Sequence, residues 1–321
     1  MKLGAKGQLK PLSGAFDMVL DGHATDLTID SRSVDSLLGG VTSITGRLAR
    51  DETGLKDGKL KIENQQLTLA ADGKFATGKA DFGFDFTLAD LALASKQASG
   101  RLTASGRAKG DNGRIALAFK AEVPHGALVG RELSGAALNF DGILQDGNLS
   151  GGIQGNAQLD RTPIAIHSDV TIADGAKRLT DLTFSAGATQ LAGELGQSAA
   201  GLLDGRLSLA STDISTAAAL LLQQASGAAK ADIKLSNAEG KQAADISAKL
   251  DGLTIGDNHI GQAQVKAAIA DLFGVPAVEG SIKASGLTLA KVEVATLDAD
   301  ANRNGEATRF SATARLKNGT D

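Results

Sequence analysis

An alternation of apolar and polar residues with a period of two recurs along nearly all of this 321-residue chain. Successive side chains of a β-strand point to opposite faces of its sheet, so this period predicts strands with one apolar and one polar face. Residues 114–123 give a clear example. Their apolar side carries Ile115, Leu117, Phe119, Ala121 and Val123, and their polar side carries Arg114, Lys120 and Glu122. The pattern predicts an all-β fold.

Short turn signals that contain Gly separate the alternating runs. Asp-Gly pairs stand at 57–58, 72–73, 146–147 and 204–205, with Asp-Asn-Gly at 111–113 and Asn-Gly at 304–305. Such residues supply the positive φ angles that tight hairpin turns require. Strands joined at this short spacing predict an antiparallel meander, because a parallel sheet needs long crossover connections.

Residues 211–230, STDISTAAALLLQQASGAAK, depart from the period of two. A Thr-Asp pair precedes apolar residues at helical spacing, and Gly227 stands where a helix would stop. We predict one short helix over residues 215–225. A helix of this length is stable only when it is packed, so we expect it to lie against the end of a sheet.

Composition limits how the strands can pack. The chain is 42% hydrophobic but only 3% aromatic, with no Trp, no Tyr and 40 Gly. Protein interiors pack as densely as organic crystals, and a deep core made mostly of Leu and Ala would fill its space poorly. A thin structure avoids this problem because its core is never deep. We therefore predict one elongated, repetitive antiparallel array over residues 1–321, without an evident internal boundary.

Residues 81–95, DFGFDFTLADLALAS, contain the clearest apolar face. One side of the extended chain carries Phe82, Phe84, Phe86 and Leu88. This face either packs against a second sheet in a closed core or lines an open groove, and the residues alone leave both possibilities open. At 89–90 the phase of the alternation shifts. The shift predicts a β-bulge or bend, which is the feature that curls a sheet.

Few residues indicate chemistry. The sequence has no Cys, no phosphate-binding Gly-rich loop and no nucleophile elbow. Residues 300–311 are similar to a calcium loop, but Ser311 stands where a bidentate Glu is required, and a hairpin turn at 304–305 is the better interpretation. The four histidines are far apart, at 23, 125, 167 and 259. We expect no enzyme activity, no metal site and no cofactor.

Charge gives one further candidate surface. The net charge of −4 and the scarcity of stacking rings argue against a nucleic-acid partner. Residues 96–120 are nevertheless locally basic around the single acid Asp111, with Lys96, Arg101, Arg107, Lys109, Arg114 and Lys120. This stretch is either a rim for anionic lipid headgroups or a solvated sheet face. No apolar run reaches the length of a membrane span, and the N-terminus has no signal-peptide pattern.

Two stretches resemble the TamB family, the inner-membrane subunit of the translocation and assembly module of Gram-negative bacteria, within the AsmA-like group of bridge proteins. Residues 179–221 have strands around a Gly-rich turn and then an aspartate that opens a short Leu/Ala helix. Residues 278–301 follow the family pattern of Gly, an alternating apolar run, Gly-Leu-x-Leu and a second run. The family's N-terminal membrane anchor and C-terminal domain are not found, so the chain resembles an internal fragment.

The resemblance implies a sheet folded lengthwise into an open, taco-like trough with an apolar inner face. It implies a periplasmic segment that conducts phospholipid between the inner and outer membranes and supports outer-membrane biogenesis and protein assembly. The inner-membrane anchor and the contacts to an outer-membrane barrel partner of the TamA type would lie outside this chain. The expected groove residues are Phe82, Phe84, Phe86, Leu88, Ile115, Leu117, Phe119, Val123, Leu182 and Phe184.

A second interpretation stays open beside the lipid groove. The chain could be a structural or adhesin-like β-array with a closed, dry core and no lipid transport. The two interpretations differ in one observable feature, since a groove leaves its apolar face uncovered, whereas a closed array packs that face against a second sheet.

Overall fold

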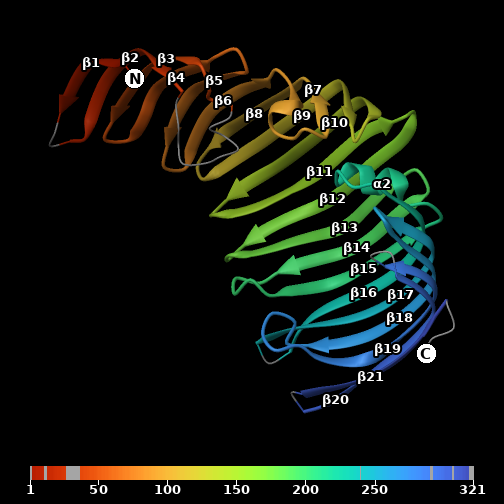
Figure 1. The fold of residues 1–321 in the computed structure, drawn as a ribbon. Helices are drawn as coiled ribbons and strands as arrows, with labels where there is room; N and C mark the ends of the chain where they lie inside the picture. Colours follow the sequence, from red (N-terminus) through yellow and green to blue (C-terminus); the bar gives the residue numbers. More distant parts are fainter. Residues whose placement is uncertain are drawn as a thin grey trace. The chain divides into compact units, whose positions relative to one another are not determined.

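The computed structural model describes residues 2–10, 13–26, 37–238, 240–289, 292–305 and 307–317. Contacts group the chain into two units, Met1–Arg161 (unit 1) and Thr162–Asp321 (unit 2), and each is described by itself. Both units consist of strands that pair antiparallel with their neighbours in the chain (Figure 1). The predicted all-β, antiparallel fold is therefore confirmed. The strand pattern is the same on both sides of the division.

Unit 1 pairs its strands in chain order, except that the short strand β7 pairs with β9 and leaves β6 to pair with β8. In the described residues β1 and β11 do not pair with each other, so this sheet stays open. Its elements are β1 (Lys2–Lys10), β2 (Ala15–Thr25), β3 (Val41–Asp51), β4 (Gly54–Glu63), β5 (Leu67–Ala76), β6 (Lys79–Leu88), the 3-10 helix η1 (Leu91–Leu93), β7 (Ala98–Gly100), β8 (Leu102–Asp111), β9 (Arg114–Leu128), β10 (Arg131–Gln145) and β11 (Asn148–Leu159).

Unit 2 is a second antiparallel meander whose long strands bend along their length (Figure 1). Among its described residues, β12 and β21 do not pair with each other, so this sheet is open as well. Its elements are β12 (Thr162–Ala173), β13 (Ala176–Ala186), β14 (Thr189–Gln197), β15 (Leu203–Ser211), α2 (Ser215–Leu220), β16 (Ala225–Ala238), β17 (Lys241–Ile255), β18 (Asn258–Ala270), β19 (Ala277–Leu289), β20 (Val292–Asn304) and β21 (Ala307–Leu316).

Half of the predicted turns are hairpins and half are not. The turns at 111–113, 146–147 and 304–305 join β8 to β9, β10 to β11 and β20 to β21. The pairs at 57–58, 72–73 and 204–205 lie inside β4, β5 and β15 instead. At Gly205, which has φ of +141°, a Cβ would overlap the carbonyl oxygen of Glu194 on β14. Glycine there allows a close approach of the neighbouring strand and does not reverse the chain.

The predicted helix exists but is shorter than predicted. It begins at Ser215 as expected and ends at Leu220, not at residue 225. Leu222 has a positive φ of +56°, which ends the helix and turns the chain into β16. Gly227 does not close the helix, because it lies within β16, where its carbonyl oxygen accepts a hydrogen bond from Ile214 at 2.9 Å.

Of the two features predicted at 89–90, the bulge is wrong, and the chain bends at Ala89 as it leaves the sheet. Strand β6 ends at Leu88, and the chain leaves the sheet to form η1 before it returns as β8. The N-cap of η1 is Asp90, whose side chain accepts a hydrogen bond from the backbone nitrogen of Ala92 at 3.0 Å. The phase shift in the sequence therefore marks a strand end, which has the same period-breaking signature as a bulge.

The two borders of each sheet differ. The border that we call the turn rim holds the connections β3–β4, β5–β6, β8–β9 and β10–β11 in unit 1, which contain two residues each. The opposite border, the capped rim, holds the longer helical connections, with η1 between β6 and β8 in unit 1 and α2 between β15 and β16 in unit 2. Among the described residues, the helical turns η1 and α2 therefore lie at the capped rim of their sheets.

A buried amide fastens the strands of unit 2 near its turn rim. The side chain of Gln242, on β17, is only 1% exposed. Its Oε1 accepts a hydrogen bond from the backbone nitrogen of Leu203 at 2.6 Å, and its Nε2 donates to the carbonyl oxygens of Leu203 at 2.9 Å and Ser236 at 3.2 Å. One side chain thus joins the start of β15 to the β16–β17 hairpin. Sequence reasoning missed it, because nothing local marks a Gln for burial.

Replacement of Gln242 by Leu should destabilise unit 2. The variant leaves the backbone nitrogen of Leu203 without its partner, and a buried unsatisfied group costs about 1–3 kcal/mol. The matched control is Gln190→Leu on the exposed face of β14, which should change the free energy of unfolding by less than about 0.5 kcal/mol. Urea unfolding measures both values. Equal effects of the two substitutions would contradict the role of Gln242.

Candidate functional site

Strand register places apolar residues of unit 1 in continuous rows on one face of its sheet. Residues directly opposite on paired strands share a face. Successive pairings from β2 to β11 give the row Leu20, Gly46, Leu60, Ala71, Phe84, Gly106, Phe119, Phe140 and Ile153. Every member is apolar or Gly. This surface is called the apolar face of unit 1.

Unit 2 has its own apolar face, built by the same rule. The pairings from β13 to β21 give the row Phe184, Leu191, Leu209, Ala231, Ala248, Val265, Ile282, Ala299 and Ala312. Phe184 is the one ring in this row, whereas the row of unit 1 has three. The apolar face of unit 2 therefore has an aliphatic floor.

The opposite face of each sheet, the charged face, is polar. In unit 1 one of its rows is Asp85, Ser105, Lys120, Asn139 and Gln154. In unit 2 a comparable row is Gln190, Ala210, Lys230, Lys249, Gln264, Lys283, Asp298 and Thr313. Such a division between faces is expected of a sheet with only one side toward solvent.

No second sheet packs on either apolar face in the described residues, because within each unit the strand pairings and element contacts run between neighbouring strands of one meander. Large apolar side chains on these faces remain accessible: Leu138 and Ile282 are each 40% exposed. The accessible surface of the chain is 19190 Å². Two separate compact domains of half its 32.5 kDa mass would expose only about 15,000 Å² together. Much apolar surface is therefore left open.

The structure places all ten predicted groove residues on the apolar faces. In unit 1, β6 and β9 lie on either side of β8, so the Phe82–Leu88 and Ile115–Val123 sets share one surface. Leu88 and Ile115 lie near strand ends and are buried, Val123 is buried within β9, and the remaining members are half-buried. In unit 2, Leu182 and Phe184 stand on the apolar face of β13.

Glycines accommodate the rings on the apolar face of unit 1. Phe84 and Phe119 lie on either side of Gly106 in the same row, with ring centroids 6.3 Å apart and planes tilted by 36°. A Cβ added at Gly106 would overlap the ring of Phe84, so that ring lies over the glycine. The ring of Phe140 covers Gly142 and Gly151 in the same way. Flat rings above glycines are a known means of stabilising a sheet.

A small dry core closes the apolar face at the capped rim of unit 1. Leu38, Leu67 and Leu88 are buried together, and Leu91 and Leu93 of η1 pack against them. Asn64 holds this corner: its Nδ2 donates to the carbonyl oxygen of Leu37 at 2.9 Å, and its Oδ1 accepts from the backbone nitrogen of Leu67 at 2.8 Å. Sequence reasoning missed Asn64 and Asp90, although both are residues that commonly cap turns.

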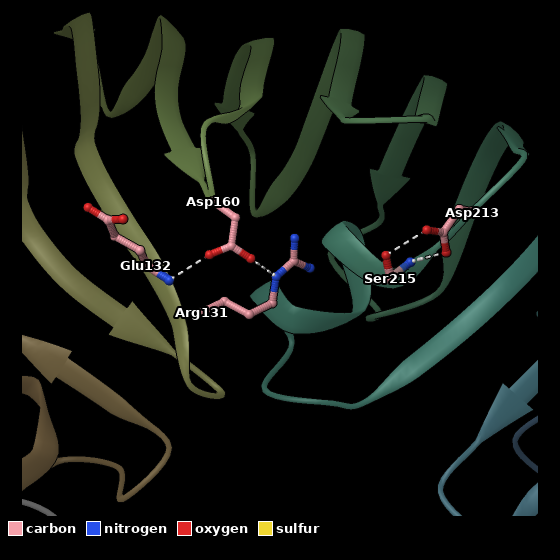
Figure 2. A network of polar contacts seen from close by, with 5 residues as sticks. All are labelled: Arg131, Glu132, Asp160, Asp213 and Ser215. Carbon is pink, nitrogen blue, oxygen red and sulfur yellow. Dashed lines mark hydrogen bonds and ion pairs between the residues drawn. The ribbon is translucent and has the colours of Figure 1, made fainter.

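Two acidic side chains fix further points of the capped rims (Figure 2). In unit 1, Asp160 accepts from Arg131 Nε at 2.7 Å and from the backbone nitrogen of Glu132 at 2.9 Å. These donors, the Arg131 side chain first, hold the pKa of Asp160 below its usual range. In unit 2, Asp213 accepts from the backbone nitrogen of Ser215 at 3.0 Å and from its hydroxyl at 2.8 Å, which fixes the start of α2.

Three of the six cations in the basic stretch at residues 96–120 have a partner on the charged face. Arg107 contacts Asp81 at 2.9 Å, Lys120 contacts Glu122 at 2.8 Å, and Arg114 donates to Gln145 at 3.0 Å. Exposed pairs of this kind stabilise a protein little. Their side chains stand on the face opposite the groove candidates. The arrangement favours the solvated sheet face over a headgroup rim at the groove.

One hollow on the charged face of unit 2, of about 830 Å³, crosses β14 to β19. Its ionisable lining residues balance, with three cations against three acids: Arg206, Lys234, Lys266, Asp232, Asp245 and Glu279. Lys234 and Asp245 are themselves 3.9 Å apart and already neutralise each other. We place no ligand there.

Metal-binding clusters and membrane-spanning helices are both absent from the described residues. These residues contain no group of three or more His, Cys, Asp or Glu side chains placed to hold a metal ion. They also contain no helix long and apolar enough to cross a membrane. Neither a family model, nor a curated protein sequence, nor a solved structure matches the chain. The candidate site consists of the two apolar faces that strand register builds in the two units.

Asp90 should hold η1 against the apolar face in a pH-dependent way. Backbone nitrogens of Ala92 and Gly100 donate to its carboxylate at 3.0 and 2.9 Å, and these bonds lower its pKa. A folded-state pKa below the unfolded value of about 3.9 means that the stabilisation is complete above that value. It is lost as the pH falls through the folded-state pKa.

An Asp90→Ala variant should reproduce that loss at neutral pH. Amide hydrogen exchange at Ala92 and Gly100 should become faster, because both nitrogens lose their acceptor, while exchange in β9 should not change. Asp85→Ala, on the exposed charged face of β6, is the control and should leave these amides protected. Carboxyl NMR titration of the wild type gives the pKa directly, and a value at or above 3.9 would contradict the assignment.

Proposed function

We propose that this protein binds phospholipid along its apolar faces and acts as a periplasmic segment of a bridge that conducts lipid between the inner and outer membranes. The observation that carries the proposal is the unbroken apolar row on an uncovered sheet face in each unit. Water next to such a face is unfavourable, and an acyl chain is the occupant that removes the most apolar area from water without requiring a polar partner.

The dimensions of the rows suit an extended hydrocarbon chain. The row of unit 1 crosses nine strands, and strands lie roughly 4.8 Å apart, so it extends roughly 38 Å. Half of a bilayer's hydrocarbon core is about 15 Å thick. A row of this length accommodates a whole acyl chain and leaves room for it to advance. The charged face keeps the outside of the sheet soluble at the same time.

The resemblance to the TamB family supports the same proposal from separate features. In that setting the segment supports outer-membrane biogenesis and protein assembly. Its inner-membrane anchor and its contacts to an outer-membrane barrel partner would be supplied by regions outside this chain. These assignments of location and partner rest on the resemblance and belong to the proposal.

The structural or adhesin-like array is the second candidate, and the observed packing favours it less. A closed array needs a partner layer for each apolar face, and none is present in the described residues. The buried hydrophobic residues of unit 1 lie mainly near strand ends, as Leu67, Leu88, Ile115 and Leu159 do. That distribution is opposite to the central core of a sandwich.

Photo-crosslinking at neighbouring positions tests lipid contact. A photoreactive amino acid at Leu117 on the apolar face should capture phospholipid in cells, and one at Ala118 on the charged face should not. The two sites are adjacent on β9, so the level of expression and the local fold are matched. Mass spectrometry identifies the adduct. Equal capture at both positions, or capture at neither, would favour the structural array.

A charge on the apolar face should block lipid without unfolding the sheet. Leu117→Arg should abolish lipid capture, because the guanidinium places a hydrated charge in the path of the acyl chain. In an open face that charge stays partly solvated, so circular dichroism should retain the strand signal. Ala118→Arg on the charged face is the control and should bind lipid normally. Loss of the strand signal in Leu117→Arg alone would indicate that the face is buried in a closed core.

A further inference from the structure

On the apolar face of unit 1, a phenylalanine ring covers a glycine of the neighbouring strand. No ring covers a glycine in this way among the described residues of unit 2. The ring of Phe84 lies across the strand boundary onto Gly106, which separates it from Phe119. Three ring atoms, Cε1, Cζ and Cδ1, occupy the space that a side chain at Gly106 would need. The ring therefore lies along the floor of the face and does not stand up from it.

We propose that Gly106 is a positioning residue that keeps the Phe84 ring flat, so that a lipid acyl chain can pass over β6, β8 and β9. This inference rests on the proposed function and adds a specific residue to it. The glycine makes no contact with lipid by itself. It acts through the ring. Because Gly106 has no side chain, the ring lies flat and leaves the space above the apolar face open to an acyl chain.

The direct neighbours of Phe84 in the row differ in size. On one side stands Gly106, which has no side chain, and on the other stands Ala71 of β5, which carries a methyl group. A methyl group at position 106 would displace the ring from its present place. The ring then has to rotate away from the sheet and into the space above the apolar face.

Gly106→Ala should move the Phe84 ring and leave the backbone of the sheet unchanged. The atoms that a Cβ would overlap all belong to the far end of a side chain, and the backbone at Gly106 does not adopt a positive φ. By contrast, Gly142 and Gly151 also face backbone oxygens of the neighbouring strands, so changes there would disturb the sheet itself. The Gly106→Ala chain should therefore fold, with the ring as the part that moves.

Gly83→Ala is the matched control. Gly83 precedes Phe84 on β6 and stands on the charged face, where an added Cβ would meet only ordinary contacts, the nearest being the carbonyl oxygen of Gly106 at 3.5 Å. The same methyl group is thus added one residue away, on the opposite face. A double variant, Gly106→Ala with Phe84→Ala, removes the ring and should restore passage.

The experiment uses the whole chain and vesicles of phosphatidylethanolamine that contain a trace of a phospholipid with a diazirine on its acyl chain. After irradiation, trypsin releases residues 115–120 from β9 and residues 207–230 from unit 2, because cleavage follows Arg114, Lys120, Arg206 and Lys230. Labelling of the first peptide relative to the second is the readout. The unit 2 peptide reports lipid binding that Gly106 does not influence.

In Gly106→Ala the relative labelling of residues 115–120 should fall on the order of tenfold, because a raised ring fills the space of the acyl chain. Gly83→Ala and the double variant should match the wild type. Unchanged labelling in Gly106→Ala would overturn the inference while the proposed function stands. A wild type that labels neither peptide would overturn the proposed function, and the inference with it.

A second measurement does not depend on the folding of a variant. In wild-type chain with labelled Phe, nuclear Overhauser contacts should connect the ring protons of Phe84 to the Cα protons of Gly106. Their absence would show that the ring is not seated on the glycine, and this would overturn the inference whatever the labelling shows.

Discussion

Strand register is the constraint on which the rest of this structure depends. Side chains alternate between faces, so a slip of one residue between two strands would move an entire apolar set to the solvent face. In each unit the recorded pairings keep apolar residues opposite one another from strand to strand, even where a register shift interrupts a pair, as between Ser134 and Ala137. A continuous apolar face is therefore a consequence of pairing alone and needs no second layer to define it.

Residue size along the rows explains the unusual composition. On β6 the rings have very small neighbours: Phe82 stands opposite Gly73 on one side and Ala108 on the other, and Phe84 stands opposite Ala71 and Gly106. A sheet that packs against another sheet would need bulky residues at most of these positions. An uncovered face has no such requirement, and small residues let the rings lie along the sheet. The high Gly content is thus part of the face as well as of the turns.

The sequence predicted the features that depend on local periodicity. The alternation identified the strands and placed all ten groove candidates on the apolar faces, and cap residues identified the start of α2 at Ser215. It could not separate an Asp-Gly turn from an Asp-Gly pair inside a strand, as at Gly205, because the close approach of Glu194 is a tertiary contact. Gln242 and Asn64 were missed for the same reason, since their partners lie on other strands.

The difference between the two rims explains how a stable sheet can keep an apolar face open. At the capped rim of unit 1, Leu67, Leu88 and Leu159 are almost fully buried, and each such side chain stabilises the fold by about 2 kcal/mol. The polar residues that fasten this border, Asn64, Asp90 and Asp160, each accept from backbone nitrogens, so the connections there are fixed as well as packed. In unit 1 several buried leucines and fixed connections therefore gather at this border. The middle of the sheet then needs no covering layer, and its apolar surface stays accessible to a ligand.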